Sequence, residues 1–340
     1  MRKTVNREIR LAAHPVGWPK ASDFELVETP LPEPAEGEVL ARNLYMSVDP
    51  YMRRRMEDRK SYMPGFQLGQ ALQGGAIGRV LASQDPDFAE GDFVSSMLGW
   101  REYFVASGAT LRKLDPKPAP LSYHLGVLGM PGLTAYVGLL DIGQPKAEET
   151  VFVSAAAGAV GSVVGQIAKL EGCRVVGSAG SDAKVALLRE ELGFDAAFNY
   201  RDVKLGTALA EACPDGIDIY FDNVGGAQLD AALLRMNPFG RIPACGMISQ
   251  YNVEGPSPGL RYLATIIANR VTLKGFIVSD HFDRLPDFQA DMSRWLSESK
   301  IVVKETVIEG IGSAVAAFLG MLRGENIGKM IVKLGPDPVS

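Results

Sequence analysis

The alternation of apolar and polar positions divides the chain into two parts. Between residues 30 and 120, short apolar runs such as EVLARNLYMSV, GGAIGRVLAS and REYFVAS are separated by turns that contain Gly and Pro. Frequent turns between short apolar runs are typical of a mostly-β unit. From about residue 125 the pattern changes to strand-like runs that alternate with helix-like runs. The chain is therefore predicted to combine a mostly-β unit with an α/β unit.

The α/β part begins with the run VFVS, and a helix is predicted at residues 159–170, where Val160, Val163 and Ile167 have helical spacing. Further strand-like runs read RVVGSAG, AAFNY, IDIYFDN, GRIPACG and VTLKGFIV, and the helix-like runs include DAKVALLREEL, AQLDAALLRM and SPGLRYLATIIANR. Strands that alternate with helices predict a doubly wound parallel sheet. Residues 300–340 hold one more strand–helix–strand pattern. Periodicity alone leaves open whether that pattern extends this sheet or returns to the mostly-β unit.

Length and charge narrow the class of protein. A chain of 340 residues suggests two domains. Its 46% hydrophobic and 22% charged residues are ordinary for a soluble globular protein. The net charge of −5 argues against nucleic acid or an anionic membrane as the main partner. The sequence contains no uninterrupted run of about 18 apolar residues, so no transmembrane helix is predicted.

The N-terminal residues and the cysteines indicate the cellular compartment in which the protein is expected. The first residues, MRKTVNREIRLAAHP, are charged and lack the apolar core of a signal peptide, so we expect no secretory leader. Cys173, Cys213 and Cys245 are odd in number and far apart in sequence. That pattern suits a reducing compartment better than a disulfide framework, and we therefore expect a cytoplasmic protein.

One glycine-containing turn points to a ligand. Residues 156–161 read A-A-G-A-V-G, the G-x-G-x-x-G pattern of dinucleotide-binding turns with Ala156 in place of the first glycine. Gly158 would let the backbone approach a pyrophosphate, and Gly161 would allow close helix–strand packing. The following helix would offer its N-terminal N–H groups to the phosphates. A tight turn without a ligand is the alternative, but the strand before it and the further βα units favour dinucleotide binding.

The end of the next strand indicates which dinucleotide is bound. An NAD site carries an Asp or Glu about 20 residues further on, bonded to the ribose 2′-hydroxyl. Here the strand end, residues 176–180, holds no acid, and Asp182 suits helix capping. Lys184 lies within reach of a 2′-phosphate, although a lysine on a solvated helix face is the commoner case. The missing carboxylate and the nearby lysine point to NADP(H).

Several further segments carry a resemblance to a known family. They read SVDPYMRRRM, GWREY, GMPGLTAY, AAAGAVGSVVGQIAK, GSDAKV, FDNVGG, CGMISQYN, GFIVSD and GENIGK, and they span about residues 45 to 330. With them the chain resembles the medium-chain dehydrogenase/reductases. Within that group it resembles the zinc-independent leukotriene B4 12-hydroxydehydrogenase, prostaglandin reductase and double-bond reductase family. Together these segments are far more specific than the glycine turn alone.

The resemblance implies a fold, a cofactor and its site. A GroES-like, mostly-β substrate and catalytic domain would comprise residues 1–125 with 305–340, and a Rossmann NADP-binding domain residues 126–304. The cofactor would be NADP(H). Its expected contacts, taken from the matching motifs, are Met130, Thr134, Gly158, Ala159, Val160, Gly161, Lys184, Tyr200, Asn223, Cys245, Tyr251, Phe276, Ile277, Val278 and Asn326.

No metal is expected. Zinc-dependent relatives need a cysteine–histidine–acid site and a four-cysteine lobe, both largely in the first domain. This chain has no cysteine before Cys173, and His14, His124 and His281 are isolated from cysteines in sequence. Hydrogen bonds to the substrate would then have to take over the polarising role that zinc has in those relatives.

The resemblance also implies a reaction that meets this requirement. It is the NADPH-dependent reduction of the C=C bond of an α,β-unsaturated aldehyde or ketone, with hydride going to the β-carbon and a proton to the α-carbon. Negative charge develops on the carbonyl oxygen, so preorganised donors there lower the barrier. Tyr251 matches a tyrosine proposed as the acid, and Tyr51 matches one that faces the substrate. Either tyrosine could instead only pack against substrate or cofactor.

Two other functions stay open on the sequence. One is NADP-dependent alcohol–ketone or quinone oxidoreduction, and the other is a non-catalytic NADPH-binding role. The retained Tyr51, Tyr251 and cofactor segments favour the C=C reductase. A small-molecule substrate and a homodimer are expected. The residue types alone do not identify the physiological substrate.

Overall fold

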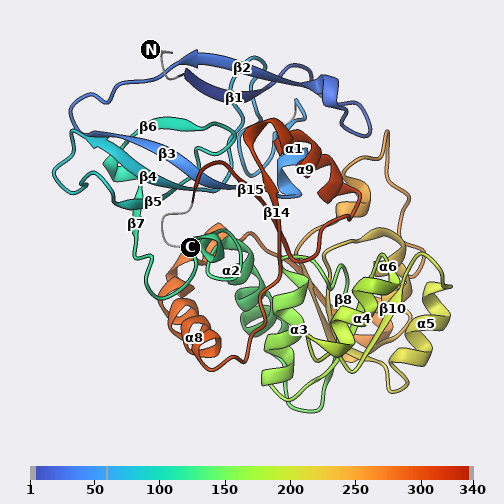
Figure 1. Ribbon diagram of the computed structural model, residues 1–340. Helices are drawn as coiled ribbons and strands as arrows, with labels where there is room; N and C mark the ends of the chain where they lie inside the picture. The colour runs from blue at the N-terminus through green and yellow to red at the C-terminus, as the bar shows by residue number, and fades with distance from the viewer. Residues whose placement is uncertain (1–4, 59, 337–340) are drawn as a thin grey trace. The chain divides into compact units, whose positions relative to one another are not determined.

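The chain forms two compact units in a computed structural model that describes residues 5–58 and 60–336 (Figure 1). Unit 1 comprises Met1–Leu125, Glu305–Asn326 and Met330–Ser340. Unit 2 comprises Gly126–Lys304 and Ile327–Lys329. In the described part of the chain, no helix is long and apolar enough to cross a membrane.

Unit 1 is built on a mostly antiparallel sheet with the strand order β14-β15-β3-β4-β5-β7, in which β6 also pairs with β3. The strands are β3 (Glu38–Ser47), β4 (Ala76–Ser83), β5 (Phe93–Ser96), β6 (Tyr103–Ser107), β7 (Arg112–Leu114), β14 (Glu305–Glu309) and β15 (Lys329–Lys333). β15 pairs antiparallel with β3, so the last strand–helix–strand segment returns to the mostly-β sheet. This pairing answers the question that periodicity leaves open.

A separate hairpin and two α-helices complete unit 1. The hairpin strands are β1 (Val5–Leu11) and β2 (Phe24–Pro30), and the helices are α1 (Tyr51–Arg55) and α9 (Ala314–Leu322). The Trp100 ring is fully buried, stacked on Phe24 with ring centroids 6.4 Å apart and edge-on to Phe318 at 5.9 Å. This aromatic cluster ties β2 and α9 together, because large rings bury much apolar surface at one point.

Unit 2 has the predicted doubly wound sheet. Its strands are parallel and lie in the order β10-β9-β8-β11-β12-β13. They are β8 (Thr150–Val153), β9 (Arg174–Ala179), β10 (Ala196–Asn199), β11 (Ile217–Phe221), β12 (Met236–Ala244) and β13 (Thr272–Gly275). Successive strands are added on one side of β8 as far as β10 and on its other side from β11 onward, so the strand order switches between β8 and β11. Dinucleotides bind at such a switch point in sheets of this kind. The predicted fold class is confirmed.

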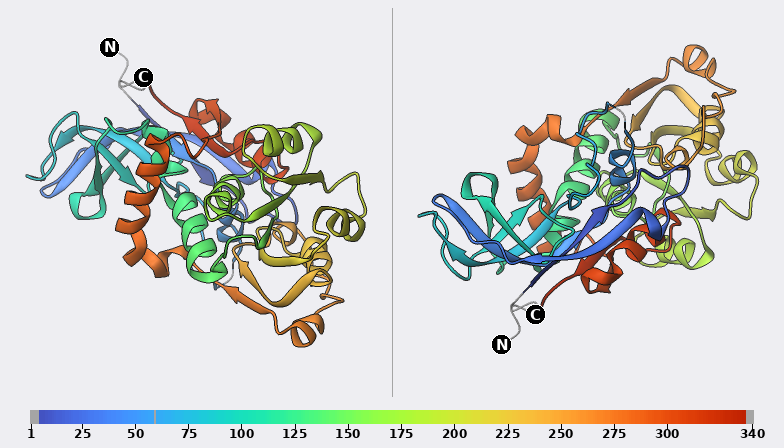
Figure 2. Two further views of the ribbon diagram at one scale, coloured as in Figure 1. Left: turned by 90° about the horizontal axis from the view of Figure 1, so that it is seen from below. Right: turned by 90° about the horizontal axis from the view of Figure 1, so that it is seen from above.

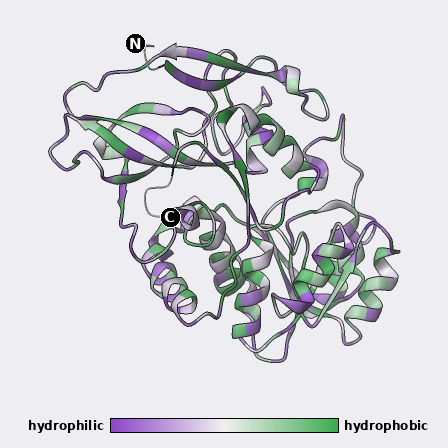
Figure 3. Cartoon of the chain, viewed as in Figure 1, coloured by the Kyte–Doolittle hydropathy of each residue, from purple (hydrophilic) through white to green (hydrophobic). Residues whose placement is uncertain are grey.

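Helices cover both faces of this sheet. α3 (Gly161–Leu170) and α4 (Asp182–Glu190) lie on one face, and α5 (Leu205–Ala212) and α6 (Gly226–Leu233) on the other (Figure 2). α2 (Met130–Tyr136) and α8 (Leu285–Ser297) lie side by side. All four residues of β8 are buried, as expected of a strand covered on both faces. α8 instead shows alternating hydrophobic and hydrophilic bands, since one side of it faces solvent (Figure 3).

Two predicted elements are shorter than the apolar pattern suggests. The helix predicted from SPGLRYLATIIANR is α-helical only as α7 (Thr265–Asn269). Pro256 and Pro258 lack backbone donors, and the backbone N–H groups of Arg261 and Tyr262 donate to the Asp230 carboxylate instead of to a helix. The strand predicted from VTLKGFIV is likewise limited to the four residues of β13.

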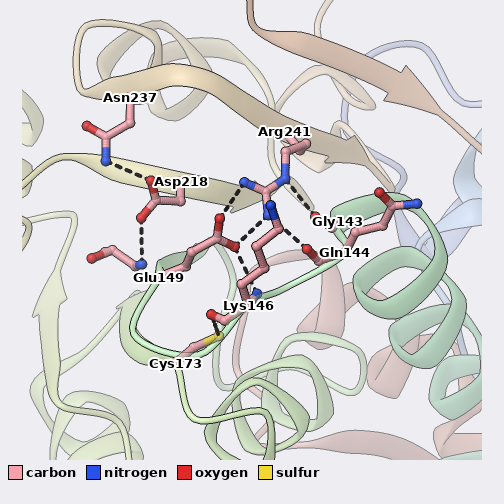
Figure 4. A network of polar contacts seen from close by, with 9 residues as sticks. Gly143, Gln144, Lys146, Glu149, Cys173, Asp218, Asn237 and Arg241 are labelled. Atoms are coloured by element: carbon pink, nitrogen blue, oxygen red, sulfur yellow. Dashed lines mark hydrogen bonds and ion pairs between the residues drawn. The ribbon is translucent and has the colours of Figure 1, made fainter.

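One arginine of β12 holds the end of the sheet at which β8 begins (Figure 4). The Arg241 guanidinium contacts both carboxylate oxygens of Glu149, at 2.9 and 2.5 Å. It also donates to the backbone carbonyls of Gly143 and Gln144, each at 2.9 Å. Asp218 extends the network, because its carboxylate accepts from the backbone N–H of residue 150 and from the side chain of Asn237. A bidentate, largely buried pair of this kind is stronger than an exposed ion pair.

Arg241→Gln is expected to lower the free energy of unfolding by about 1–3 kcal/mol, since it leaves a part-buried carboxylate without its main partner. Burial alone would raise the pKa of Glu149, but the hydrogen bonds from Arg241 and from the Lys146 backbone lower it overall. The stability from Glu149 is therefore present above the ordinary pKa of a glutamate and is lost as the pH falls through the lowered value. Urea unfolding at neutral and at acid pH measures both effects. Lys300→Gln, which breaks a half-exposed ion pair with Glu298, should leave stability unchanged.

Candidate functional site

The turn between β8 and α3 has the form of a phosphate-binding turn. Gly158 N–H donates to the Ala155 carbonyl at 2.9 Å, and no side chain of the described residues caps the start of α3. A Cβ on Gly161 would lie 2.5 Å from the Ala155 carbonyl oxygen, whereas a Cβ on Gly158 would meet only that oxygen, at 3.1 Å. Gly161 is thus required for the packing of the turn itself. The opening at Gly158 lets a ligand approach the backbone.

The structure explains why Ala156 replaces the usual first glycine. Ala156 is fully buried, and its N–H donates to the Ser178 carbonyl of β9 at 3.0 Å. A Cβ on Gly177 would lie only 2.9 Å from the Cβ of Ala156. The small residue that the close approach of β8 and β9 requires therefore stands at 177 instead of 156. The left-handed conformation in the turn belongs to Ala155, with φ of 49°.

The carboxyl ends of β9 and β10 bring two cations together. Lys184 is half-buried, and the pKa of its amine is lowered by burial and by the positive charge of Arg201. Arg201 also lies over the Tyr200 ring, 5.9 Å from the ring centroid, which is within the reach of a cation–π contact. Ser181 caps α4, and Asp182 accepts from Asn199 at 3.1 Å. Two neighbouring cations at the ends of adjacent strands form a favourable site for an anion.

A buried polar network lies at the carboxyl ends of β8 and β11. The Tyr220 hydroxyl donates to Asp222 Oδ1 at 2.6 Å and lies 3.1 Å from the Ser154 hydroxyl. The same Asp222 oxygen accepts from the backbone N–H groups of Val224 and Gly225, at 2.9 and 2.8 Å. Burial raises the pKa of Asp222 despite these hydrogen bonds. The network fixes the chain where it leaves β11.

This network also orients Asn223. Its backbone N–H donates to the Ser154 hydroxyl at 3.0 Å, and its side-chain Nδ2 donates to the Ser154 carbonyl at 2.8 Å. With the amide nitrogen bound to the protein, the side-chain carbonyl is the part that Asn223 can present to a ligand. Asn223 would then accept a hydrogen bond from a ribose hydroxyl.

Tyr220→Phe is expected to lower the free energy of unfolding by about 1–3 kcal/mol, because Asp222 loses a short hydrogen bond inside the protein. It should also weaken dinucleotide binding, since Asn223 depends on the same network. Equilibrium unfolding and fluorescence titration with NADPH measure the two effects. Tyr262→Phe is a matched control, because its ring packs at the edge of the same core while none of the network contacts involves it. An equal loss of NADPH affinity in both variants would contradict the assigned role of the network.

The segment after β12 continues from this network. Backbone N–H groups of Cys245 and Gly246 donate to the Asp222 carbonyl at 2.9 and 3.1 Å. Burial and the nearby Asp222 raise the pKa of the Cys245 thiol to about 12, so that it stays protonated. Tyr251 is half-buried, and its hydroxyl accepts from the Met247 N–H at 3.4 Å. A hydroxyl that accepts from the backbone keeps its own proton for donation.

The remaining predicted cofactor residues of unit 2 lie in two segments, helix α2 and residues 276–278. The Thr134 hydroxyl donates to the Met130 carbonyl in α2 at 2.8 Å, and Met130 is 39% exposed. Phe276 is half-buried and packs edge-on against Phe221, with Ile277 and Val278 following it. Thus Thr134 uses its hydroxyl within its own helix. Its expected contribution to a ligand is through the rest of its side chain.

The residues that the sequence assigns to unit 1 are Tyr51 and Asn326. Tyr51 begins α1, and its hydroxyl oxygen is buried. Asn326 is half-buried and lies two residues before Gly328. Gly328 N–H donates to the Ala157 carbonyl of the glycine turn at 2.8 Å. A Cβ on Gly328 would lie 1.8 Å from the Lys304 carbonyl oxygen, so only glycine fits there.

Two family models match most of the chain. One, described as the N-terminal domain of oxidoreductase, matches residues 7–114, and the other, described as zinc-binding dehydrogenase, matches residues 159–298. The chain is 46% identical over 340 residues to the NADPH-dependent curcumin reductase of Escherichia coli, covering 98% of this chain and 99% of that protein. It is 46% identical over 339 residues to the NADP(+)-dependent 2-alkenal reductase of Nicotiana tabacum, covering 98% of each.

A solved structure agrees with these sequence relatives. The structure of CurA in complex with NADPH from Vibrio vulnificus matches with a TM-score of 0.94 and 44% identity, over 97% of this chain and 100% of that one. The chain belongs to the zinc-independent medium-chain dehydrogenase/reductase family. Among the described residues of this family member, no group of three or more His, Cys, Asp or Glu side chains is placed to hold a metal.

Several residues of this reductase-family site were not predicted from the sequence. Arg201 follows Tyr200 directly, but a charged residue in a loop carries no signal by itself. Tyr220, Asp222 and Ser154 lie in or next to apolar strands, where a polar side chain is the available hint. Gly177 could have been found as the small residue opposite Ala156.

Proposed function

We propose that this protein is an NADPH-dependent reductase of the C=C bond of α,β-unsaturated aldehydes or ketones. Its relatives include proteins named for 2-alkenal, prostaglandin and curcumin reduction. The observation that carries the cofactor choice is the pair of neighbouring cations, Lys184 and Arg201, at the carboxyl ends of β9 and β10. An NAD site would hold a carboxylate at the end of β9.

The residues of unit 2 fit an NADP molecule. The turn at Gly158 leaves its backbone open on one side, and the uncapped start of α3 offers N–H groups to a pyrophosphate. Lys184, Tyr200 and Arg201 would hold the 2′-phosphate. Asn223 would accept from a ribose hydroxyl. When bound, NADPH supplies the hydride that goes to the β-carbon of the substrate.

The reaction assigns different tasks to two tyrosines. Hydride addition to the β-carbon moves the C=C electron pair toward the carbonyl oxygen, where a phenol can stabilise the charge by donating a hydrogen bond. Burial raises the pKa of the Tyr51 phenol above its ordinary value, so Tyr51 stays a donor at physiological pH. Tyr251, whose hydroxyl accepts from a backbone N–H, would provide the proton for the α-carbon.

A homodimer in the cytoplasm is part of the proposal. β13 is an edge strand, all four of its residues are exposed, and Ile267 and Phe282 nearby are 81% and 56% exposed. An open edge beside exposed apolar side chains is suited to pairing with a second copy of the chain. The three cysteines are free thiols, consistent with a reducing compartment.

A parallel assay of (E)-hex-2-enal with NADPH and with NADH tests the proposed cofactor and substrate class. We expect oxidation of NADPH and a kcat/KM with NADH that is at least about 10-fold lower, because the two cations gain nothing from a free 2′-hydroxyl. Equal use of the two cofactors would contradict the assignment of Lys184 and Arg201. Oxidation of secondary alcohols by NADP⁺ without any enal reduction would favour the alcohol–ketone alternative.

A further inference from the structure

Helix α1 carries two buried arginines whose surroundings differ. Arg53 is 3% exposed and Arg55 is 6% exposed. Burying a guanidinium is costly unless its donors are paired, and arginine does not lose its proton in proteins. Residues four apart share one face of a helix, so Arg55 lies on the same face as Tyr51. Both belong to unit 1.

Arg55 is fixed on three sides. Its Nε donates to the Pro64 carbonyl and its Nη2 to the Gln73 side-chain oxygen, each at 2.9 Å. The guanidinium lies 4.1 Å from the centroid of the Phe66 ring. These contacts hold the plane of the group. Its Nη1 is buried and, among the described residues, has no hydrogen-bond partner of good geometry.

The Tyr51 hydroxyl is the second polar atom of this kind. It too is buried and lacks a well-aligned partner within the described chain. Burial is the largest cause of the raised pKa of the Tyr51 phenol; the negative charge of Asp49 raises it further, and the positive charge of Arg55 lowers it. Arg55 is therefore near enough to act on the Tyr51 oxygen.

The chemistry of the two groups allows one complementary pairing. Nη1 of an arginine can only donate, and a phenol oxygen can accept while it donates its own proton elsewhere. If Arg55 supports the oxygen of Tyr51, the O–H of Tyr51 is left for a ligand. The positive charge of the Arg55 guanidinium then lies next to the Tyr51 hydroxyl.

We propose that Arg55 is a positioning residue for C=C reduction, which acts through Tyr51. It holds the phenol oxygen so that the Tyr51 O–H donates to the carbonyl oxygen of the substrate, and its charge strengthens that donor. As the β-carbon gains hydride, the C=C electron pair moves to the carbonyl oxygen, and the α-carbon later takes a proton. Tyr51 keeps its own proton throughout. This inference rests on the proposed function.

Arg53 provides a matched control on the same helix. Its Nη1 is paired with Glu57 at 3.1 Å, and its Nη2 donates to the Gly17 carbonyl at 2.8 Å. Arg53 is as buried as Arg55, but both of its Nη nitrogens are paired with groups other than Tyr51. Arg53→Gln should lower Tm as much as Arg55→Gln, without any specific coupling to Tyr51.

A double-mutant cycle of Tyr51→Phe and Arg55→Gln tests the proposal, with (E)-hex-2-enal and NADPH in the full-length protein. We expect each single variant to lower kcat/KM by about 10- to 100-fold, as for loss of a charge-assisted hydrogen bond. The double variant should be no worse than the worse single variant. In the same cycle, Arg53→Gln and Tyr51→Phe should give independent effects.

Binding of (E)-hex-2-enoate to the NADP⁺ complex provides a second readout, measured by calorimetry. This carboxylate places negative charge where the reaction develops it, so we expect Tyr51→Phe and Arg55→Gln each to raise its Kd at least about 10-fold, and Arg53→Gln to leave it unchanged.

The outcomes separate the two proposals. Independent effects of Tyr51→Phe and Arg55→Gln, an unchanged rate in Tyr51→Phe, or equal Kd values for the Arg53 and Arg55 variants would overturn the role of Arg55 while the wild type still reduces the enal. A wild-type protein that does not reduce enals would overturn the proposed function itself, and with it this inference.

Discussion

Lys184→Ala is expected to raise the KM for NADPH by about 10- to 100-fold and to leave the KM for NADH unchanged. A charge-assisted hydrogen bond to a phosphate contributes about 1.5–3 kcal/mol, and only NADPH carries the 2′-phosphate. In the structure, Lys184 is held near Arg201, and the repulsion between the two cations is relieved when a dianion binds. Steady-state kinetics with both cofactors measure the change.

Two further variants sharpen this test. Arg189→Ala removes an exposed cation from the last turn of the same helix, α4, and should change neither KM. Arg201→Ala should act in the same direction as Lys184→Ala, because it removes the second cation. Equal losses for NADPH and NADH in Lys184→Ala would mean that Lys184 supports the fold of the site and does not recognise the 2′-phosphate.

Two glycines of the cofactor turn are expected to respond differently to alanine. In Gly161→Ala the new Cβ would meet the Ala155 carbonyl oxygen at 2.5 Å and the Ala156 Cα at 2.8 Å, and backbone atoms cannot give way easily. We expect a loss of about 1–3 kcal/mol in the free energy of unfolding. In Gly158→Ala the contact is one oxygen at 3.1 Å, so stability should fall by less than about 1 kcal/mol.

Gly158→Ala should lose NADPH affinity although it loses little stability. The Cβ of Gly158→Ala would stand where the backbone meets the pyrophosphate, so its Kd for NADPH should rise at least about 10-fold in a nearly stable protein. Urea unfolding without cofactor and fluorescence titration with NADPH measure the two quantities. Gly206→Ala is the control, because a Cβ there meets nothing within 4 Å and α5 should gain stability. Unchanged NADPH affinity in Gly158→Ala would contradict the assignment of the turn.

The alternation of strands and helices in unit 2 could be predicted from the sequence, because buried parallel strands and amphipathic helices have different patterns of apolar residues. The sequence was also sufficient for the glycine turn, whose residues are adjacent in the chain. The extent of SPGLRYLATIIANR was predicted wrongly, since the Asp230 carboxylate that takes the N–H groups of Arg261 and Tyr262 lies about 30 residues away. Helix propensity depends on neighbouring residues and takes no account of a carboxylate this far away in the sequence that competes for backbone N–H groups.

The candidate site shows the same limit more clearly. Lys184 could be inferred from its distance in sequence to a strand end. The cation beside it, Arg201, follows the next strand, so its position depends on how β9 and β10 pair. The choice of Ala at 156 is understood only when Gly177 of the neighbouring strand is seen against it. In both cases the deciding contact joins residues on different strands, and register sets it.

The central claim is that hydride goes to the β-carbon of a conjugated substrate. The direct measurement uses (E)-hex-2-enal and NADPH labelled with deuterium at C4 of the nicotinamide, on the face that the protein transfers, with the product analysed by NMR. The account predicts hexanal with deuterium at C3 and none at C1. Hex-2-en-1-ol with deuterium at C1 would show carbonyl reduction instead and would contradict the account.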